Sequence, residues 1–511
     1  MASDSYEVSL KQAGLIKHEE RDCCLKLHKK EWPYEVGEWK AEKNNEAQYL
    51  FRKIQFNAEE NAQRQLWEAI VRFPSAPIYG VHRKYEYPSK IDRINYHTFR
   101  LLRRSCLNQK PGPVNRIYLF HNGLNEIDHL EFYYRIADLL LKNDKKDEES
   151  ACIIRPLPGH LTRYPFSSDF TERPLDRYLG DASDLYRQFL RYMLETQWLL
   201  SILVPFRSYR VVAGLHLLAE GNEIKDGRAG PDQLRDAIYK AWKAAYDATP
   251  RDRDRGKSVT KKAIENTIKT IRWLTGWKKV ENITDPPPEE LVHPPALHVI
   301  GYSLGGFFAQ SVFFSWPFAI ASATTLASGG ALREIAPKAF SHPEEWKAVM
   351  QSLRYELDNA MIEGRLHRDA GKVAGIQEDY FSYFHRIFYE VFLQDFRGPY
   401  QSRVSEYVSR LLFMVGGKDP VVRPQALLDA SPECGINIIQ VANLDHFLFK
   451  ADKMEEWRKF WGPQICRVIH SFSERAELIL AMTLHSNWWN TERTELLKPT
   501  GSKSHGDQKV N

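Results

Sequence analysis

A hexapeptide near the middle of the chain constrains the fold more than any other feature. Gly301-Tyr302-Ser303-Leu304-Gly305-Gly306 stands between the apolar run ALHVI at 296–300 and the helical pattern FFAQSVFF at 307–314. Small residues two positions before and after a serine let the chain turn sharply from a buried strand into a helix, with the serine in strained backbone angles. Gly301 and Gly305 supply these small residues. The sequence therefore predicts that the Ser303 hydroxyl projects above a sheet, at the positive N-terminal end of a helix.

Several short apolar runs resemble the 296–300 run and predict the other strands of this sheet. They lie at residues 116–120, 151–154, 319–326, 411–415 and 436–441, and amphipathic patterns at 133–140 and 261–274 predict covering helices. Strand, helix and strand at this spacing is typical of parallel strands with helices on their faces. We therefore expect an α/β fold with a mostly parallel central sheet.

A serine hydroxyl is a poor nucleophile unless a base accepts its proton, so this turn calls for a histidine held by an acid. Asp419 follows the 411–415 run, and His446 follows the 436–441 run, so both are expected at the carboxyl ends of strands. Asp445 is the alternative acid. Adjacent residues project in different directions, however, and this disfavours a contact between Asp445 and His446.

Two backbone N–H groups are expected to form an oxyanion hole, which stabilises the negative charge that develops on a carbonyl oxygen when the serine attacks. The helix that follows Ser303 offers the N–H of Leu304, and the loop after the 116–120 strand offers a second donor. That loop begins His121-Asn122-Gly123-Leu124, and Asn122, Gly123 and Leu124 all stay open as the second donor. We expect His121 to order this loop rather than to transfer protons.

The turn, the acid loop Gly416-Gly417-Lys418-Asp419-Pro420 and the Asp445-His446 loop together resemble the serine α/β-hydrolase superfamily of esterases, lipases and thioesterases. The resemblance runs from about residue 78 to about residue 466. It implies that Ser303 is the nucleophile, that His446 is the general base and acid, and that Asp419 orients His446. It also implies a small-molecule acyl substrate, cleavage of an ester or thioester, and no cofactor. Peptidases and acyltransferases use the same triad, so they remain alternatives, as does a binding or assembly module built on this fold.

The chain is longer than these motifs require. We expect an N-terminal accessory segment over 1–76 with a helix over 57–73, a catalytic domain over 77–475 that begins with strands at 78–87 and 94–102, and a C-terminal apolar stretch with a disordered tail over 476–511. Inserts are expected at about 160–258, with a helix over 184–203, and at about 328–408, as a helical cap. Aromatic residues of that cap could wall an acyl pocket, although core packing is the favoured interpretation; they are Tyr380, Phe381, Tyr383, Phe384 and Phe388.

Composition excludes several other classes of protein. The net charge is +5 with 27% charged residues, which gives no basic stripe for nucleic acid. Six scattered cysteines and the lack of a ligand motif such as H-E-x-x-H predict neither a disulfide scaffold nor a metal site. No export signal or membrane-spanning apolar run is visible, so we expect a cytoplasmic protein. A homo-oligomer or a protein partner is possible through the N-terminal segment, the inserts or the apolar stretch at 478–489.

Overall fold

The computed structural model of the chain describes the central sheet of one α/β domain, helices that cover it and a C-terminal helix. The described residues are 49–55, 65–74, 96–104, 114–123, 130–144, 149–158, 182–203, 295–317, 319–329, 404–422, 437–442, 457–496 and the positions 344, 348, 351, 354, 355, 384, 387–393, 444 and 446.

A nine-stranded sheet organises the domain, in the order β1-β2-β3-β5-β4-β6-β7-β8-β9. Its strands are β1 (Tyr49–Gln55), β2 (Gln65–Pro74), β3 (Tyr96–Arg103), β4 (Arg116–His121), β5 (Ser150–Ile154), β6 (Ala296–Tyr302), β7 (Ile320–Leu326), β8 (Leu411–Gly416) and β9 (Asn437–Val441). Every neighbouring pair from β5 to β9 is parallel, whereas β1, β2, β3 and β5 pair antiparallel. The predicted α/β-hydrolase type of fold, with a mostly parallel sheet, is confirmed, and each of the six apolar runs forms a strand.

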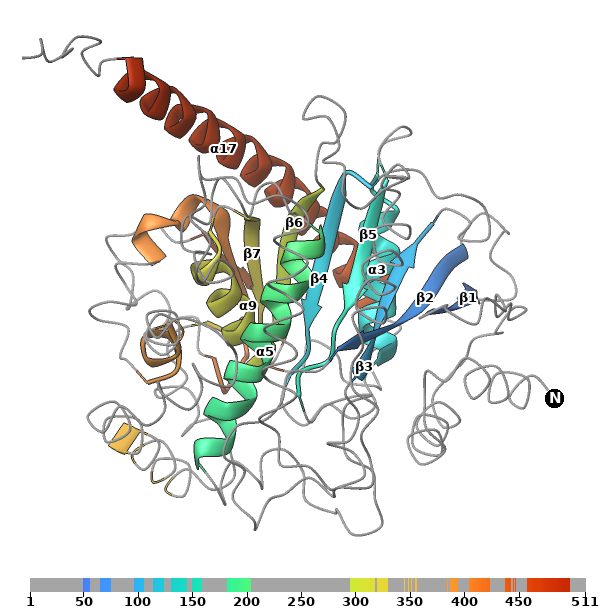
Figure 1. The fold of residues 1–511 in the computed structure, drawn as a ribbon. Helices are drawn as coiled ribbons and strands as arrows, with labels where there is room; N and C mark the ends of the chain where they lie inside the picture. The colour runs from blue at the N-terminus through green and yellow to red at the C-terminus, as the bar shows by residue number, and fades with distance from the viewer. Residues whose placement is uncertain are drawn as a thin grey trace, which may run out of the picture.

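Helices cover both faces of the sheet (Figure 1). On one face, α3 (Leu130–Leu141) and α17 (Gly462–Leu496) pack together over a shared apolar core. On the other face lie α9 (Leu304–Ser315), which is buried along its whole length, and α5 (Ala182–Leu203). Parallel strands that are covered on both faces read as continuous apolar runs, which is why these strands were visible in the sequence.

The N-terminal part of the sheet corrects one prediction. The helix expected over 57–73 is wrong over residues 65–73, because Gln65–Pro74 forms strand β2 between β1 and β3, and residues 57–64 lie outside the described residues. The sheet also begins at Tyr49, before the expected start at residue 78. Pairing with two neighbouring strands outweighs the helical spacing of a few apolar residues, since strand preference depends mainly on cross-strand packing. The N-terminal extension is thus extended, not helical, over residues 49–55 and 65–74, and residues 78–87 lie outside the described residues.

The two predicted inserts are described only in part. Helix α5 confirms the helix expected over 184–203, whereas the helix expected over 261–274 lies outside the described residues. In the second insert, the π-helical turn η5 (Tyr389–Leu393) packs on α9. Phe384 and Phe388 are fully buried, and Phe388 contacts Phe189 of α5 with ring centroids 4.9 Å apart. These two rings are therefore packing residues, and the other three cap aromatics lie outside the described residues.

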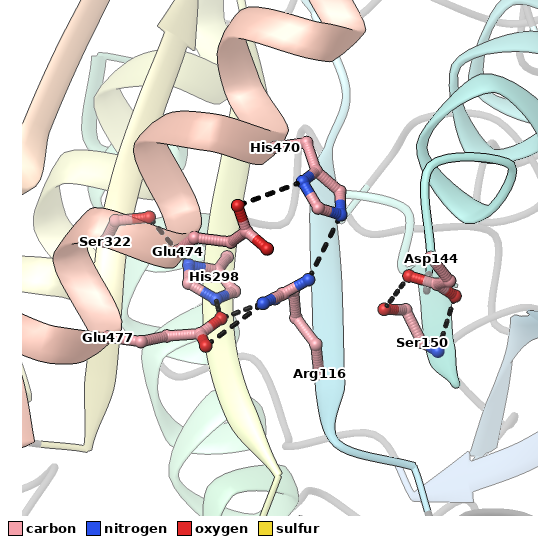
Figure 2. A network of polar contacts seen from close by, with 8 residues as sticks. All are labelled: Arg116, Asp144, Ser150, His298, Ser322, His470, Glu474 and Glu477. Carbon is pink, nitrogen blue, oxygen red and sulfur yellow. Dashed lines mark hydrogen bonds and ion pairs between the residues drawn. The ribbon is translucent and has the colours of Figure 1, made fainter. Parts of the chain in front are cut away.

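Helix α17 continues past residue 475, where the predicted catalytic domain ends. The π-helical turn η8 (Trp457–Trp461) leads into one continuous helix of 35 residues that includes the whole expected apolar stretch at 478–489, and its C-terminal half extends beyond the sheet (Figure 1). Near the middle of α17, Glu477 accepts hydrogen bonds from Arg116 at the start of β4 and from His298 of β6 (Figure 2). The helix is thus attached to the amino ends of the central strands. Among the described helices, none has the length and apolarity needed to cross a membrane.

Candidate active site

Ser303 occupies the turn between β6 and α9 in a strained conformation. Its φ of 49° and ψ of −119° are costly for a residue with a side chain, by roughly 1–3 kcal/mol. Two hydrogen bonds stabilise the turn: the Ser303 N–H donates to Leu326 O at 2.9 Å, and the Gly306 N–H donates to Ser303 O at 2.9 Å. A side chain at Gly301 would collide with the Gly305 carbonyl, and one at Gly305 would collide with the backbone after β4. Both glycines are therefore required by the close approach of backbone.

The structure brings Ser303, His446 and Asp419 into one hydrogen-bonded chain. Ser303 Oγ lies 3.0 Å from His446 Nε2, and His446 Nδ1 lies 3.0 Å from Asp419 Oδ2. A carboxylate accepts hydrogen bonds, so Nδ1 carries the proton, and the Nε2 lone pair faces the serine hydroxyl. This is the tautomer that a general base requires. Asp445, the alternative acid, lies outside the described residues.

Backbone contacts hold the acid and the histidine loops together. The other carboxylate oxygen of Asp419 accepts the N–H groups of Val421 at 2.7 Å and Val422 at 2.9 Å, which fixes the orientation of the carboxylate. The Lys418 N–H, next to Asp419, donates to the carbonyl oxygen of Leu444, two residues before His446, at 2.9 Å. Asp419 is 4% exposed and His446 is 8% exposed, so both lie largely out of water.

The loop after β4 lies against the serine turn. Leu304 is the first residue of α9, so its N–H has no acceptor within the helix and is available to a ligand. The Gly123 N–H donates to the Tyr133 hydroxyl at 3.3 Å, and the Asn122 side chain accepts the Leu157 N–H at 2.7 Å. The backbone carbonyls of His121 and Asn122 thus lie against Gly305, one residue after Leu304, and the Gly123 N–H is turned toward α3. Leu124 lies outside the described residues.

Tyr302 is a site residue that sequence reasoning missed. Its hydroxyl donates to the backbone carbonyl of His446 at 3.1 Å, and its ring packs on Phe132 with centroids 5.7 Å apart. The residue before the nucleophile thereby supports the loop that carries the histidine. The available signal was a hydroxyl-bearing aromatic residue at the buried end of an otherwise apolar strand.

The described part of the chain contains no cluster of three or more histidine, cysteine, aspartate or glutamate side chains able to hold a metal ion. The arrangement consists of a nucleophile, a base, an orienting carboxylate and backbone donors. Such a set can carry out acyl transfer through a covalent intermediate without further groups.

Comparisons with family models and with curated proteins find no match for this chain. Among solved structures, the chain is similar to an S-formylglutathione hydrolase from Agrobacterium tumefaciens, at 11% identity and a TM-score of 0.30 over 82% of this chain and 98% of that one. It is also similar to a haloalkane dehalogenase variant from Bradyrhizobium elkanii, at 11% identity and 0.29 over 76% and 96%. A third is the esterase domain of a Rhodothermus marinus protein, at 12% identity and 0.28 over 78% and 98%. At TM-scores this low, the similarity does not establish a function for this chain. The hydrogen bonds within the site are the stronger observation.

Proposed function

We propose that the protein is a serine hydrolase of the α/β-hydrolase type that cleaves a carboxylic ester or thioester. The observation that carries this proposal is the hydrogen-bonded chain from Ser303 through His446 to Asp419, with the serine on a strained strand-to-helix turn. Strain of this kind persists where it serves a site, because a relaxed turn would be more stable.

Each group has a defined part in the reaction. Ser303 Oγ attacks the acyl carbonyl carbon while His446 Nε2 accepts the hydroxyl proton, and the same proton then passes to the leaving group. The buried Asp419 carboxylate stabilises the imidazolium that forms in between. The carbonyl oxygen, which becomes negatively charged, accepts the Leu304 N–H and a second N–H from the loop after β4. Water then attacks the acyl-enzyme with His446 as base, which releases the acid and restores the serine.

The serine nucleophile separates this chemistry from that of hydrolases that attack with an aspartate. Amide hydrolysis or acyl transfer would use the same triad and the same backbone donors, with a different leaving group or acceptor. The proposal of an ester or thioester follows from the triad together with the sequence resemblance.

Labelling with a fluorophosphonate probe tests the proposal directly. Wild-type protein should be labelled at Ser303, and Ser303→Ala should lose both the label and the turnover of p-nitrophenyl esters. Ser311→Ala is the matched control, because this hydroxyl lies in the same helix and donates to Phe307 O. Labelling that persists in Ser303→Ala, or wild type without any label, would refute the proposal. Esters of increasing chain length, an acyl-CoA and an aminoacyl amide would then define the substrate.

A further inference from the structure

Helix α5 lies across α9 on the face of the sheet opposite α17 (Figure 1). Phe189 of α5 packs on Phe308 of α9 and on Phe388 of the second insert, with ring centroids 5.9 and 4.9 Å apart. Tyr192, one turn further along α5, packs edge-on against Phe308 at 5.3 Å. Helix α5 is therefore packed directly on α9, the helix that follows Ser303.

The same part of α5 surrounds a buried arginine. Arg155 follows β5, and its Nη2 lies 3.0 Å from Glu195 Oε2, with both side chains 0% exposed. The guanidinium also donates to Thr196 Oγ1 at 2.6 Å and to Tyr192 O at 3.0 Å, and it stacks 3.9 Å from the centroid of the Tyr192 ring. A buried charge is tolerated when it is paired and hydrogen-bonded, and it then fixes the groups around it. The position of the Tyr192 ring is thus determined by Arg155.

The Tyr192 hydroxyl contacts His121, the last residue of β4. It lies 2.6 Å from His121 Nδ1, and His121 is fully buried. Burial, together with the Arg155 charge, holds the pKa of His121 well below its usual range, so the ring is neutral. Within the part of the chain that the structure describes, Nε2 of this ring is buried without a hydrogen-bond partner. Tyr192 is therefore the polar anchor of the His121 side chain.

His121 is joined mechanically to the serine turn. Its backbone carbonyl, and that of Asn122, lie so close to Gly305 that a side chain there could not fit. Asn122 is held in turn by the Leu157 N–H, two residues after Arg155. A shift of the His121 ring would therefore move the backbone that leads into the proposed oxyanion donors. Displacements of about 1 Å in such a site cost up to about a hundredfold in rate.

We infer that Tyr192 is a positioning residue for the oxyanion loop, and that the inserted helix α5 thereby acts on the reaction. Its hydroxyl holds His121, and His121 sets the distance between the loop's N–H donors and the Leu304 N–H. This inference rests on the serine hydrolase function proposed above. It assigns a role in the reaction to part of the first insert.

Tyr192→Phe tests the inference, because it removes the hydroxyl and keeps the ring that packs on Phe308. We expect kcat for a p-nitrophenyl ester to fall about tenfold with an unchanged KM, since the loop's donors act mainly on the developing charge. The affinity for an aryl boronic acid, which forms a tetrahedral adduct with the serine, should fall by a similar factor. Tyr186→Phe is the matched control: it makes the same change in the same helix, where the ring packs on Phe388, and it should stay within about twofold of wild type.

A second pair of variants keeps the test decisive if Tyr192→Phe does not fold. His121→Asn retains an acceptor near the position of Nδ1, whereas His121→Leu removes it, so kcat should be higher in the asparagine variant by about the same tenfold. Wild-type kcat and boronate affinity in Tyr192→Phe, equal losses in Tyr186→Phe, or equal rates in the two His121 variants would each overturn the inference. If wild type shows no Ser303-dependent labelling, the proposed function fails as well. If that labelling is present and Tyr192→Phe has the kcat and boronate affinity of wild type, only this inference fails.

Discussion

Replacement of Glu477 by glutamine should loosen the attachment of α17 to the sheet. Glu477 Oε2 accepts a hydrogen bond from Arg116 Nη2 at 3.1 Å, Oε1 accepts another from Arg116 Nε, and His298 Nε2 lies 2.8 Å from Oε1 (Figure 2). Burial of the carboxylate raises its pKa, but the hydrogen bonds and charges of His298 and Arg116 outweigh this and lower it to about 2. Glu477→Gln leaves the buried Arg116 guanidinium without its carboxylate partner.

The size of the effect follows from the pKa. A fall from 4.5 to about 2 corresponds to roughly 3 kcal/mol at neutral pH, at about 1.36 kcal/mol for each pH unit. The side chain is 27% exposed, so water screens part of this interaction, and we expect a loss of about 2 kcal/mol in the free energy of unfolding. Because the folded pKa lies below the unfolded one, this stabilisation is present above pH 4.5 and is lost as the pH falls toward 2.

Urea unfolding at pH 7 and at about pH 3.5 measures both the loss in the free energy of unfolding and the direction in which that loss changes with pH. At pH 7 the midpoint of Glu477→Gln should fall with an unchanged m-value, and at pH 3.5 the gap to wild type should be smaller by roughly 1 kcal/mol. Glu474→Gln is the matched control on the same helix, since Glu474 lies 3.8 Å from His470 and is 35% exposed, and it should lose less than about 0.5 kcal/mol. Equal losses in the two variants, or a gap that does not change with pH, would refute the reasoning.

Three further outcomes follow from the described contacts. Tyr302→Phe removes the hydrogen bond to the His446 carbonyl, and ester kinetics should show kcat reduced by roughly three- to tenfold with KM unchanged. Gly305→Ala introduces a side chain where the loop after β4 lies, so thermal unfolding should show a loss of about 1–3 kcal/mol, together with slower probe labelling. Burial lowers the pKa of His298, so its contribution to stability is present above about pH 6.5 and is lost as the pH falls below it; His298→Asn should flatten this part of the pH–stability curve.

The central strands and the chain order of the site were predictable because their signals are local. A strand covered on both faces must be apolar throughout, and a nucleophile turn needs small residues at fixed positions. The carboxyl ends of neighbouring parallel strands meet at one edge of the sheet. For this reason, the positions of Asp419 and His446 after two apolar runs were enough to predict that they approach Ser303, as the hydrogen bonds show.

Strand β2 was not predictable for a physical reason that Glu68 illustrates. This residue is fully buried, and it accepts a hydrogen bond from Arg100 of β3 at 2.8 Å and another from Tyr134 of α3. A carboxylate in the middle of the segment hides the alternation that identifies a strand, and its partners lie more than 30 residues away. Nothing near Glu68 in the sequence indicates those partners. The apolar residues around it happened to match a helical period instead.

Contacts between residues far apart in the sequence also explain how helices α5 and α17 are placed on the sheet. Apolar faces of helices tolerate small slides against a sheet, because one aliphatic or aromatic contact can replace another. A buried ion pair does not tolerate a slide, since a separated partner would leave an uncompensated charge out of water. Arg155 with Glu195 places α5 in this way, and Arg116 with Glu477 places α17. In each case the arginine lies on or next to a central strand and the glutamate lies on a covering helix, so α5 and α17 are placed on the sheet by charge as well as by apolar packing.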